Sequence, residues 1–402
     1  MNNTKKLRIF WSSNSVWSYS GYSQAVADLL PLIRDAGYPL AISNFYGQSG
    51  GKFMLDGIMQ YPTINHTFGS DAMLWHSKDF QADIVMTLQD IWPLNPQDVS
   101  QVSRFIPWTP IDHDPLPKGV LNMLRYANRV IAMSKFGQKE MADNGIASTY
   151  IPHMVDTNIF TPLNTQEVKQ KLGIHPQVYV MGMVSANKDN PPRKAFQQVL
   201  DAFKLFLEKV PQSLLYIHTD PHFPGGFPIA EYATFLGIEK QVLFPGMGFP
   251  EIYKMKYNTG KSEMNVLYNM FDVLLSPSTS EGFGVPIIEA QATGCPVIVN
   301  NWCSMPELVK PGVTGEVCDW AIKQWTAQQS YTAIPSHISL FEKMLAVHRM
   351  DRGKTAKESR KWIVDNFDLK TVFRKSWLPF FEALEQEIYP ESVDKNSSIA
   401  IQ

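Results

Sequence analysis

The sequence has few cysteines, no long apolar run and almost no net charge. Three cysteines among 402 residues, without metal-ligand spacing and odd in number, exclude a disulfide framework and argue against a zinc site. No apolar run approaches the length of a membrane-spanning helix. The 36 basic and 38 acidic side chains nearly cancel, so no global charge recruits nucleic acid or an anionic bilayer. We expect a soluble cytoplasmic protein without a transmembrane segment.

The chain is too long for one small hydrophobic core, and about 150 residues per domain predicts two large domains. Apolar runs alternate with helical patterns along it. Leu7–Trp11 is the first such run, and Val178–Val184 begins a second series after a boundary between Pro162 and Gly173. Alternating strands and helices predict parallel sheets covered by helices.

The most informative stretch is residues 276–294, SPSTSEGFGVPIIEAQATG, which follows the apolar run Phe271–Leu275. Turn-forming Ser and Thr lead into a Gly-x-Gly bend, then a proline that can open a helix and Gly294, which can end it. We interpret the stretch as strand, loop and helix of a parallel sheet. Gly282 and Gly284 carry no side chain that would keep a ligand off the backbone.

Two carboxylates, Glu281 and Glu289, flank this bend. Open α/β sheets bind ligands at the carboxyl ends of their strands, and a helix N-terminus there offers unpaired amides to anionic or polar groups. Carboxylates suit hydroxyls, because an ionised carboxylate accepts hydrogen bonds from two neighbouring O–H groups. A site with amides for phosphate and carboxylates for hydroxyls fits a sugar nucleotide.

The Glu-x7-Glu element with Glu-Gly-Phe-Gly-Val-Pro inside it resembles the donor site of retaining GT-B glycosyltransferases, in particular glycosyltransferase family four. In that family the first Glu contacts the donor sugar, the following amides help to hold it, and the second Glu binds the nucleotide ribose. The resemblance gives these roles to Glu281 and Glu289. It makes donor-binding residues of Gly282, Phe283, Gly284 and Val285.

The resemblance implies an α/β GT-B fold, with two Rossmann-like doubly wound domains and an interdomain cleft. We expect residues 1–165, completed by a C-terminal helix at about 369–388, to form the acceptor domain. Residues 166–365 are expected to form the nucleotide-sugar donor domain, and residues 391–402 a flexible tail. After Gly315 we expect the chain to be helical.

Other positions match the family's site more loosely. His113 ends a predicted strand and corresponds to a His that lies against the donor sugar, where Asp112 and Asp114 flank it. Gly21 and Tyr22 belong to the first loop, whose family counterpart abuts the donor diphosphate and the acceptor.

The family's phosphate clamp is altered in this sequence. Lys194 matches the family's Lys, but the usual Arg is missing after Gly182, and Lys188 or Arg193 would supply its charge. Gly246 corresponds to the glycine where the family admits the nucleotide base.

The resemblance therefore implies a retaining glycosyltransferase, most simply a hexosyltransferase, that uses a UDP- or GDP-linked sugar as co-substrate and needs no other cofactor. His113, Lys194 and Glu281 are the candidate catalytic residues. We expect no metal site, since no Asp-x-Asp pair lies near the donor motif. The acceptor stays open between carbohydrate, lipid-linked and nucleic-acid classes.

Three alternatives stay open at this point. The Trp-x5-Trp-x3-Gly-Tyr loop that begins at Trp11 resembles family-four enzymes encoded by bacteriophages and actinobacteria, some of which modify nucleic acid. A phage-type glycosyltransferase of DNA or of a modified base, acting in the host cytoplasm, is the first alternative. A sugar-nucleotide epimerase and a non-catalytic nucleotide-sugar binder are the others, because one fold hosts several functions.

Overall fold

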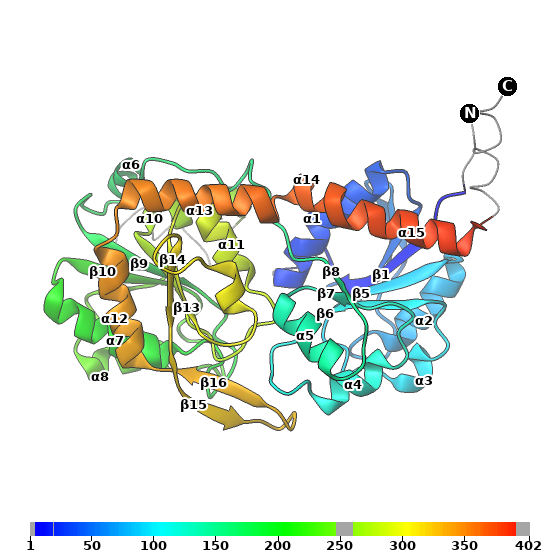
Figure 1. Ribbon diagram of the computed structural model, residues 1–402, viewed down its shortest axis with the longest axis horizontal. Coiled ribbons are helices and arrows are strands. Elements are labelled where there is room, and N and C mark those ends of the chain that lie inside the picture. The colour runs from blue at the N-terminus through cyan, green and yellow to red at the C-terminus, as the bar shows by residue number, and fades with distance from the viewer. Residues whose placement is uncertain (1–4, 19, 247–259, 391–402) are drawn as a thin grey trace. The chain divides into compact units, whose positions relative to one another are not determined.

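The structure is a computed structural model that describes residues 5–18, 20–246 and 260–390 (Figure 1). Its chain divides into two compact units. Unit 1 contains residues 1–111, 116–153 and 369–402, and unit 2 contains residues 112–115 and 154–368. The main division precedes Met154, whereas the sequence predicts it after residue 165. The predicted flexible tail, 391–402, lies outside the described residues.

Unit 1 is built on an eight-stranded sheet in the order β3-β4-β2-β1-β5-β6-β7-β8. All neighbouring strands are parallel except β3 and β4, which are antiparallel. The strands are β1 (Ile9–Asn14), β2 (Leu40–Tyr46), β3 (Phe53–Leu55), β4 (Ile58–Tyr61), β5 (Ile84–Leu88), β6 (Phe105–Thr109), β7 (Ile131–Ala132) and β8 (Thr149–Tyr150).

Helices cover the sheet of unit 1, and the C-terminal segment contributes to its core. Trp377 is fully buried and packs against Trp11 and Trp108 from the sheet, with ring centroids 5.9 and 5.0 Å away. Burial of such large rings supplies much of the hydrophobic stabilisation of a domain. The helices are α1 (Gly21–Asp35), α2 (Ser70–Asp79), α3 (Pro96–Val99), α4 (Lys118–Leu124), α5 (Lys135–Asp143), α14 (Leu369–Val372), a π-helical turn (Phe373–Trp377) and α15 (Leu378–Ile388).

Unit 2 has a six-stranded parallel sheet in the order β11-β10-β9-β12-β13-β14. Counted within the unit, this order is 3-2-1-4-5-6, which is the arrangement of doubly wound dinucleotide-binding sheets. The α/β prediction with two Rossmann-like doubly wound domains is confirmed. The strands are β9 (Tyr179–Val184), β10 (Ser213–His218), β11 (Val242–Leu243), β12 (Val273–Ser276), β13 (Val297–Asn300) and β14 (Gly315–Cys318).

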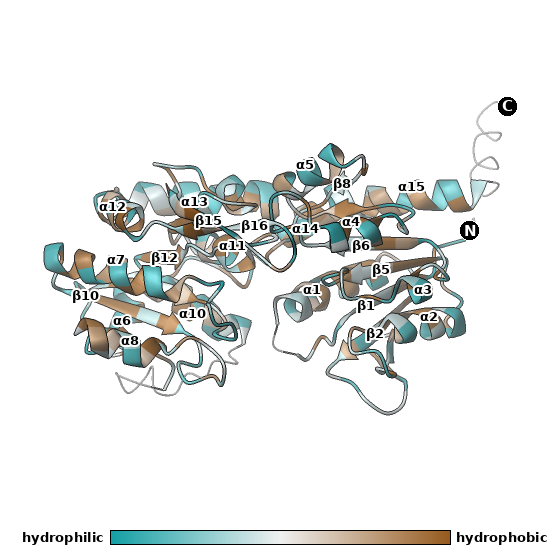
Figure 2. Cartoon of the chain, turned by 90° about the horizontal axis from the view of Figure 1, so that it is seen from below, coloured by the Kyte–Doolittle hydropathy of each residue, from teal (hydrophilic) through white to brown (hydrophobic). Residues whose placement is uncertain are grey.

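The helices of unit 2 pack on both faces of this sheet through apolar stripes. Figure 2 shows the hydrophobic strands, such as β10, beside helices that carry both hydrophilic and hydrophobic residues, as amphipathic helices do. In α7, Phe196, Phe203 and Phe206 are fully buried. The helices are α6 (Thr165–Lys171), α7 (Phe196–Lys209), α8 (Ile229–Leu236), α10 (Lys261–Met270), α11 (Val285–Ala292), the 3-10 turn Met305–Leu308, α12 (His337–His348) and α13 (Arg352–Phe367).

The expectation of helix directly after Gly315 is wrong. Strand β14 begins there, and an antiparallel hairpin of β15 (Trp320–Trp325) and β16 (Tyr331–Pro335) precedes α12. Every residue of β15 is exposed, so no apolar face marks the strand in the sequence. The hairpin is drawn in gold at the lower edge of unit 2 in Figure 1.

Candidate active site

The candidate site lies where the strand order of unit 2 reverses, between β9 and β12. These two strands are parallel neighbours, with Gly182 opposite Leu274. The loops that leave their carboxyl ends therefore lie side by side, which is where open α/β sheets bind ligands. The loop after β9 leads into α7 and carries Arg193 and Lys194, and the loop after β12 leads into α11 and carries Glu281.

Arg193 and Lys194 both form ion pairs with Glu281. The Lys194 ammonium contacts Oε1 of Glu281, and Nη1 of Arg193 lies 3.2 Å from Oε2. The Glu281 and Lys194 side chains are only 12% and 17% exposed. Two cations thus face one carboxylate in a place where the Lys194 and Glu281 side chains have little solvent around them, and charge interactions there are stronger than in water. Lys188 is exposed, and among the described residues the ion pairs of Glu281 are those with Arg193 and Lys194.

The protonation of Glu281 follows from these contacts. Burial raises the pKa of its carboxyl, but the charges of Lys194 and Arg193 outweigh burial and bring the pKa down to about 2. Glu281 in turn raises the pKa of Arg193, and Asp112 adds to that rise. Burial and the neighbouring Arg193 lower the pKa of Lys194. At neutral pH the carboxylate is ionised and can accept hydrogen bonds from hydroxyls.

The Gly-x-Gly bend depends on its second glycine. Gly284 has φ +108° at the N-cap of α11, and a Cβ there would lie 2.6 Å from Cδ1 of Ile287. Only glycine satisfies both conditions without strain. The buried Ser304 hydroxyl lies 2.8 Å from the carbonyl oxygen of Glu281 and 2.9 Å from that of Phe283. This contact with the backbone on both sides of Gly282 holds the bend in its conformation.

Glu289 is held by a residue that the sequence analysis did not single out. The hydroxyl of Tyr268, on α10, donates a 2.7 Å hydrogen bond to Oε2 of Glu289, on α11. Burial and the nearby carboxylate raise the pKa of Tyr268 well above its ordinary value, so it remains a donor. The two residues are 21 positions apart on different helices, and no sequence pattern links them.

His113 belongs by its contacts to unit 2, as part of the tetrapeptide 112–115, although the segments before and after this tetrapeptide lie in unit 1. Its Nδ1 lies 2.6 Å from Oδ1 of Asp112, which fixes the ring orientation. Asp112 is held by the Cys303 thiol, which donates to its carbonyl oxygen at 2.9 Å. Asp114 and Tyr331 exchange two backbone hydrogen bonds of 3.2 and 2.9 Å. The His-bearing tetrapeptide is thus fastened to the rest of unit 2 by residues on the loop after β13 and on β16.

The remaining predicted residues are distributed over both units. Gly21 is the first residue of α1 in unit 1, and the Tyr22 hydroxyl lies 3.3 Å from Oδ2 of Asp90, after β5. These two loops follow β1 and β5, where the strand order of unit 1 reverses. Gly246 follows the edge strand β11 with φ +78°, a backbone conformation that favours glycine.

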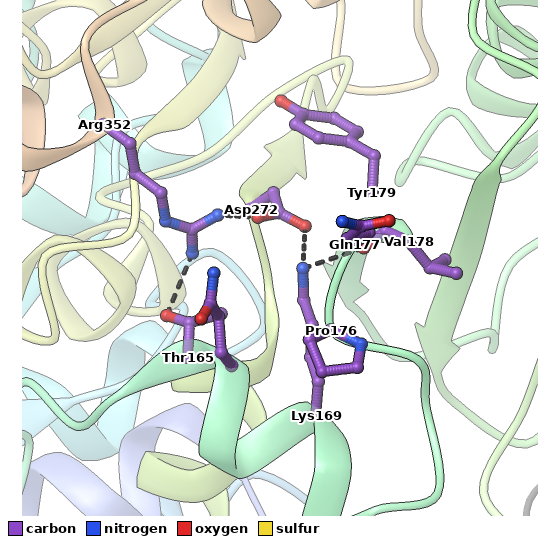
Figure 3. Close-up of a pocket in the computed structure, with 9 residues that line it drawn as sticks. Thr165, Lys169, Pro176, Gln177, Val178, Tyr179, Asp272 and Arg352 are labelled. Atoms are coloured by element: carbon purple, nitrogen blue, oxygen red, sulfur yellow. Dashed lines mark hydrogen bonds and ion pairs between the residues drawn. The ribbon is translucent and has the colours of Figure 1, made fainter.

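A pocket of unit 2 lies at the other ends of β9 and β12 from the candidate site (Figure 3). It has a volume of about 160 Å³ and is located at the amino ends of β9 and β12. Lys169 and Arg352 approach Asp272 from two sides, and the amide of Val180 donates to Asp272 at 2.7 Å. With Lys169 and Asp272 both almost fully buried, this network fastens the two central strands together. It holds none of the predicted site residues.

Two further observations concern the described residues as a whole. Over residues 5–18, 20–246 and 260–390, no helix has the length and hydrophobicity that crossing a membrane requires. The same part of the chain holds no group of three or more His, Cys, Asp or Glu side chains arranged to bind a metal ion.

Sequence comparison connects unit 2 to a known family. Residues 164–329 match the family model of glycosyl transferases group 1. The D-inositol 3-phosphate glycosyltransferase of Corynebacterium efficiens is 30% identical over 171 residues, which are 41% of this chain and 37% of the relative. The N-acetyl-alpha-D-glucosaminyl L-malate synthase of Bacillus anthracis is 25% identical over 247 residues, which are 61% of this chain and 55% of the relative. The chain spans between about a third and two fifths of the first curated relatives that it matches.

Structure comparison covers nearly the whole chain. Sucrose-phosphate synthase (tll1590) from Thermosynechococcus elongatus matches with a TM-score of 0.74 at 14% identity, over 94% of this chain and 99% of that one. Anabaena Alr3699/HepE in complex with UDP and glucose matches with a TM-score of 0.67 at 17% identity, over 93% of this chain and 99% of that one. These likenesses confirm the predicted GT-B fold.

Proposed function

We propose that this chain, whose residues 164–329 match the group 1 glycosyl transferases, moves a sugar from a nucleoside-diphosphate sugar to an acceptor hydroxyl. The observation that carries the proposal is the cluster of Arg193, Lys194 and Glu281 at the strand-order reversal of unit 2. It combines two cationic side chains for a diphosphate with an ionised carboxylate for a sugar hydroxyl, in one place.

The cationic side of the cluster suits the leaving group of such a reaction. Negative charge develops on the diphosphate as its bond to the sugar breaks, and preorganised cations in a desolvated site stabilise that charge. Lys194 and Arg193 lie just before the first turn of α7, whose unpaired amides add to the positive potential. In this arrangement Arg193, rather than the exposed Lys188, replaces the Arg that is missing after Gly182.

The carboxylates suit the two sugars of the donor. We assign the transferred sugar to Glu281 and the amides of Gly282–Val285, and the ribose to Glu289. The hydrogen bond from Tyr268 fixes one oxygen of Glu289. Anabaena Alr3699/HepE, solved with UDP-glucose, supports a UDP-linked donor, and a GDP-linked hexose is the other choice.

The reaction that we propose retains the anomeric configuration and proceeds without a metal ion. The bond from the anomeric carbon to the diphosphate oxygen breaks, and a bond to the acceptor oxygen forms on the same face of the sugar. The leaving phosphate takes the acceptor's proton, so no protein group has to act as a nucleophile. His113, whose ring is oriented by Asp112, binds the transferred sugar beside the reacting carbon.

Donor binding and donor hydrolysis test this proposal directly. We expect UDP-glucose or a GDP-linked hexose to raise the melting temperature of the full chain and to release nucleoside diphosphate slowly in water. Glu281→Ala should abolish both effects, whereas Glu342→Ala, an exposed change on α12, should leave them unchanged. Activity that survives a chelator supports metal independence, and NMR of the product's anomeric proton reports retention.

Two results would overturn the proposal. If no nucleotide sugar stabilises the protein, it is not a nucleotide-sugar enzyme. If the donor sugar is converted to another free nucleotide sugar without any transfer, the protein is an epimerase instead.

A further inference from the structure

The β15–β16 hairpin presents a surface of aromatic side chains next to the loop that carries His113. Trp325 is 55% exposed, Trp320 39% and Tyr331 37%, which are high values for rings of this size. Exposed groups of large apolar side chains, as distinct from single ones, mark interaction sites.

A β-bulge places these rings on one face. Trp325 pairs with Tyr331, and Lys323 pairs with Ala333, so the side chains of Lys323, Trp325 and Tyr331 lie on the same side of the hairpin. Trp320 precedes Lys323 by three positions and would point to the other side in a regular strand. The register shifts between Trp320 and Ile322, and this extra residue turns Trp320 to the side of Lys323.

Lys323 holds the rings in position. Its ammonium lies 4.8 Å from the ring centroid of Trp302, 5.6 Å from that of Trp320 and 6.0 Å from that of Tyr331. Trp325 packs edge-on against Tyr331 at 4.8 Å. A cation among aromatic faces restrains them, so a ligand that stacks on these rings loses little side-chain entropy on binding.

The aromatic surface is continuous with the candidate active site. Tyr331 exchanges two backbone hydrogen bonds with Asp114, the neighbour of His113. The amide of Ala333 donates to the carbonyl oxygen of Thr279, two residues before Glu281, at 3.0 Å. The side-chain amide of Asn300 donates to the carbonyl oxygens of Ser278 and Ala333 at 3.0 and 2.8 Å. One network of backbone hydrogen bonds, completed by the Asn300 side chain, thus joins the hairpin, the His113 loop and the loop that carries Glu281.

We propose that this hairpin is an acceptor subsite that binds a carbohydrate by stacking pyranose rings on Trp325, Tyr331 and Trp320. The inference rests on the proposed function and names the class of acceptor. The C–H faces of a pyranose pack on indole and phenol rings, while Lys323 and Asp114 offer a donor and an acceptor to its hydroxyls.

The charge of the surface separates a sugar from a nucleic acid. Asp114 accompanies Lys323 there, and Lys323 lies 3.7 Å from Oδ2 of Asp114. A nucleic-acid site needs an excess of cations that neutralise phosphates, and this surface has none. A neutral, hydroxyl-rich ligand fits both the rings and the balanced charge.

An array of immobilised oligosaccharides, probed with the labelled full chain, tests the proposal. We expect the wild type to bind a subset of the glycans, and Trp325→Ala to weaken that binding about tenfold. Trp325→Phe keeps a stacking ring and should retain binding within about threefold of the wild type. Trp75→Ala is the matched control, since Trp75 is 61% exposed on α2 of unit 1 and should not affect glycan binding. Melting temperatures of all variants show that each one is folded.

Three outcomes would overturn the subsite: no glycan bound by the wild type, equal binding by wild type and Trp325→Ala, or Trp325-dependent binding of a single-stranded DNA oligonucleotide instead. Failure of the proposed function has a different signature. In that case no UDP- or GDP-linked sugar shifts the melting temperature of the wild type, whatever the array shows.

Discussion

Lys194 and Glu281 form an ion pair across 87 residues of sequence, because the strands that precede their loops are neighbours in the sheet of unit 2. The pair is not balanced, since Arg193 also contacts the carboxylate. One carboxylate therefore holds two cations in place. When an anionic ligand arrives, the cations are already assembled and little reorganisation is needed.

Replacing these cations should identify the phosphate clamp. We expect Arg193→Gln and Lys194→Gln each to raise the Kd for UDP about tenfold or more, because each removes a charge-assisted contact from a poorly solvated site. Lys188→Gln should change it less than threefold, since Lys188 is exposed. Isothermal titration calorimetry gives the three constants, and Lys204→Gln, an exposed change on α7, controls for net charge. A larger effect of Lys188→Gln than of Arg193→Gln would reverse our assignment.

The depressed pKa of Glu281 should appear in the pH dependence of stability. In the folded chain this pKa is about 2, against 4.5 ordinarily, so the ionised form is favoured in the native state. The stabilisation is fully present above pH 4.5 and is lost as the pH falls to 2, and its size is about 3 kcal/mol. Urea unfolding of wild type and Glu281→Gln should give a stability difference that shrinks from pH 6 to pH 3. A difference that stays constant over this range contradicts the ion-pair interpretation.

Removing one hydroxyl should weaken the ribose end of the site. Tyr268→Phe deletes the hydrogen bond to Glu289 and leaves that partly buried carboxylate with one donor fewer. We expect a loss of about 1 kcal/mol of stability and a several-fold weaker affinity for UDP. Tyr216→Phe is the matched control, because its hydroxyl is also buried and contacts His218 on β10 at 3.2 Å. It should lower stability without changing UDP affinity.

Gly182 is expected to be needed for packing. A Cβ at this position would lie 2.2 Å from ring carbons of Phe271, so Gly182→Ala forces the ring or strand β9 to move. Overpacking of this kind costs about 1–3 kcal/mol. Thermal unfolding should show a melting temperature several degrees lower, while Gly51→Ala, which has no atom within 4 Å of the new methyl group, should leave it unchanged. Unaltered melting of Gly182→Ala would show that the ring can move at little cost.

Much of the fold could be predicted from the sequence because buried parallel strands are continuous apolar runs. The run before residue 276 became β12, and the helix that opens at Pro286 became α11. The family resemblance also directed attention to Glu281 and Lys194, which the structure brings together. The catalytic and binding roles of these residues stay predictions.

Other parts of the site left no local signal in the sequence. Tyr268 contacts Glu289, and Ser304 contacts the Gly-x-Gly bend, in each case through its hydroxyl group. A lone Tyr or Ser so far away in the sequence forms no motif from which such a contact could be predicted. The hairpin was missed because β15 has no buried face, and the two-residue periodicity that reveals strands depends on one. The positions of these two residues and of the hairpin are determined by tertiary contacts, which no local sequence pattern reveals.

The tetrapeptide 112–115 has a consequence for how the protein is made. Its partners, Cys303 and Tyr331, are encoded far downstream. In a nascent chain, His113 is therefore synthesised long before the residues that hold its loop in place. The ribosome must translate past residue 331 before the imidazole acquires its surroundings. Trp377, which packs against Trp11 and Trp108 in the core of unit 1, is encoded later still. Both unit 1 and the candidate reaction centre are therefore completed late in translation.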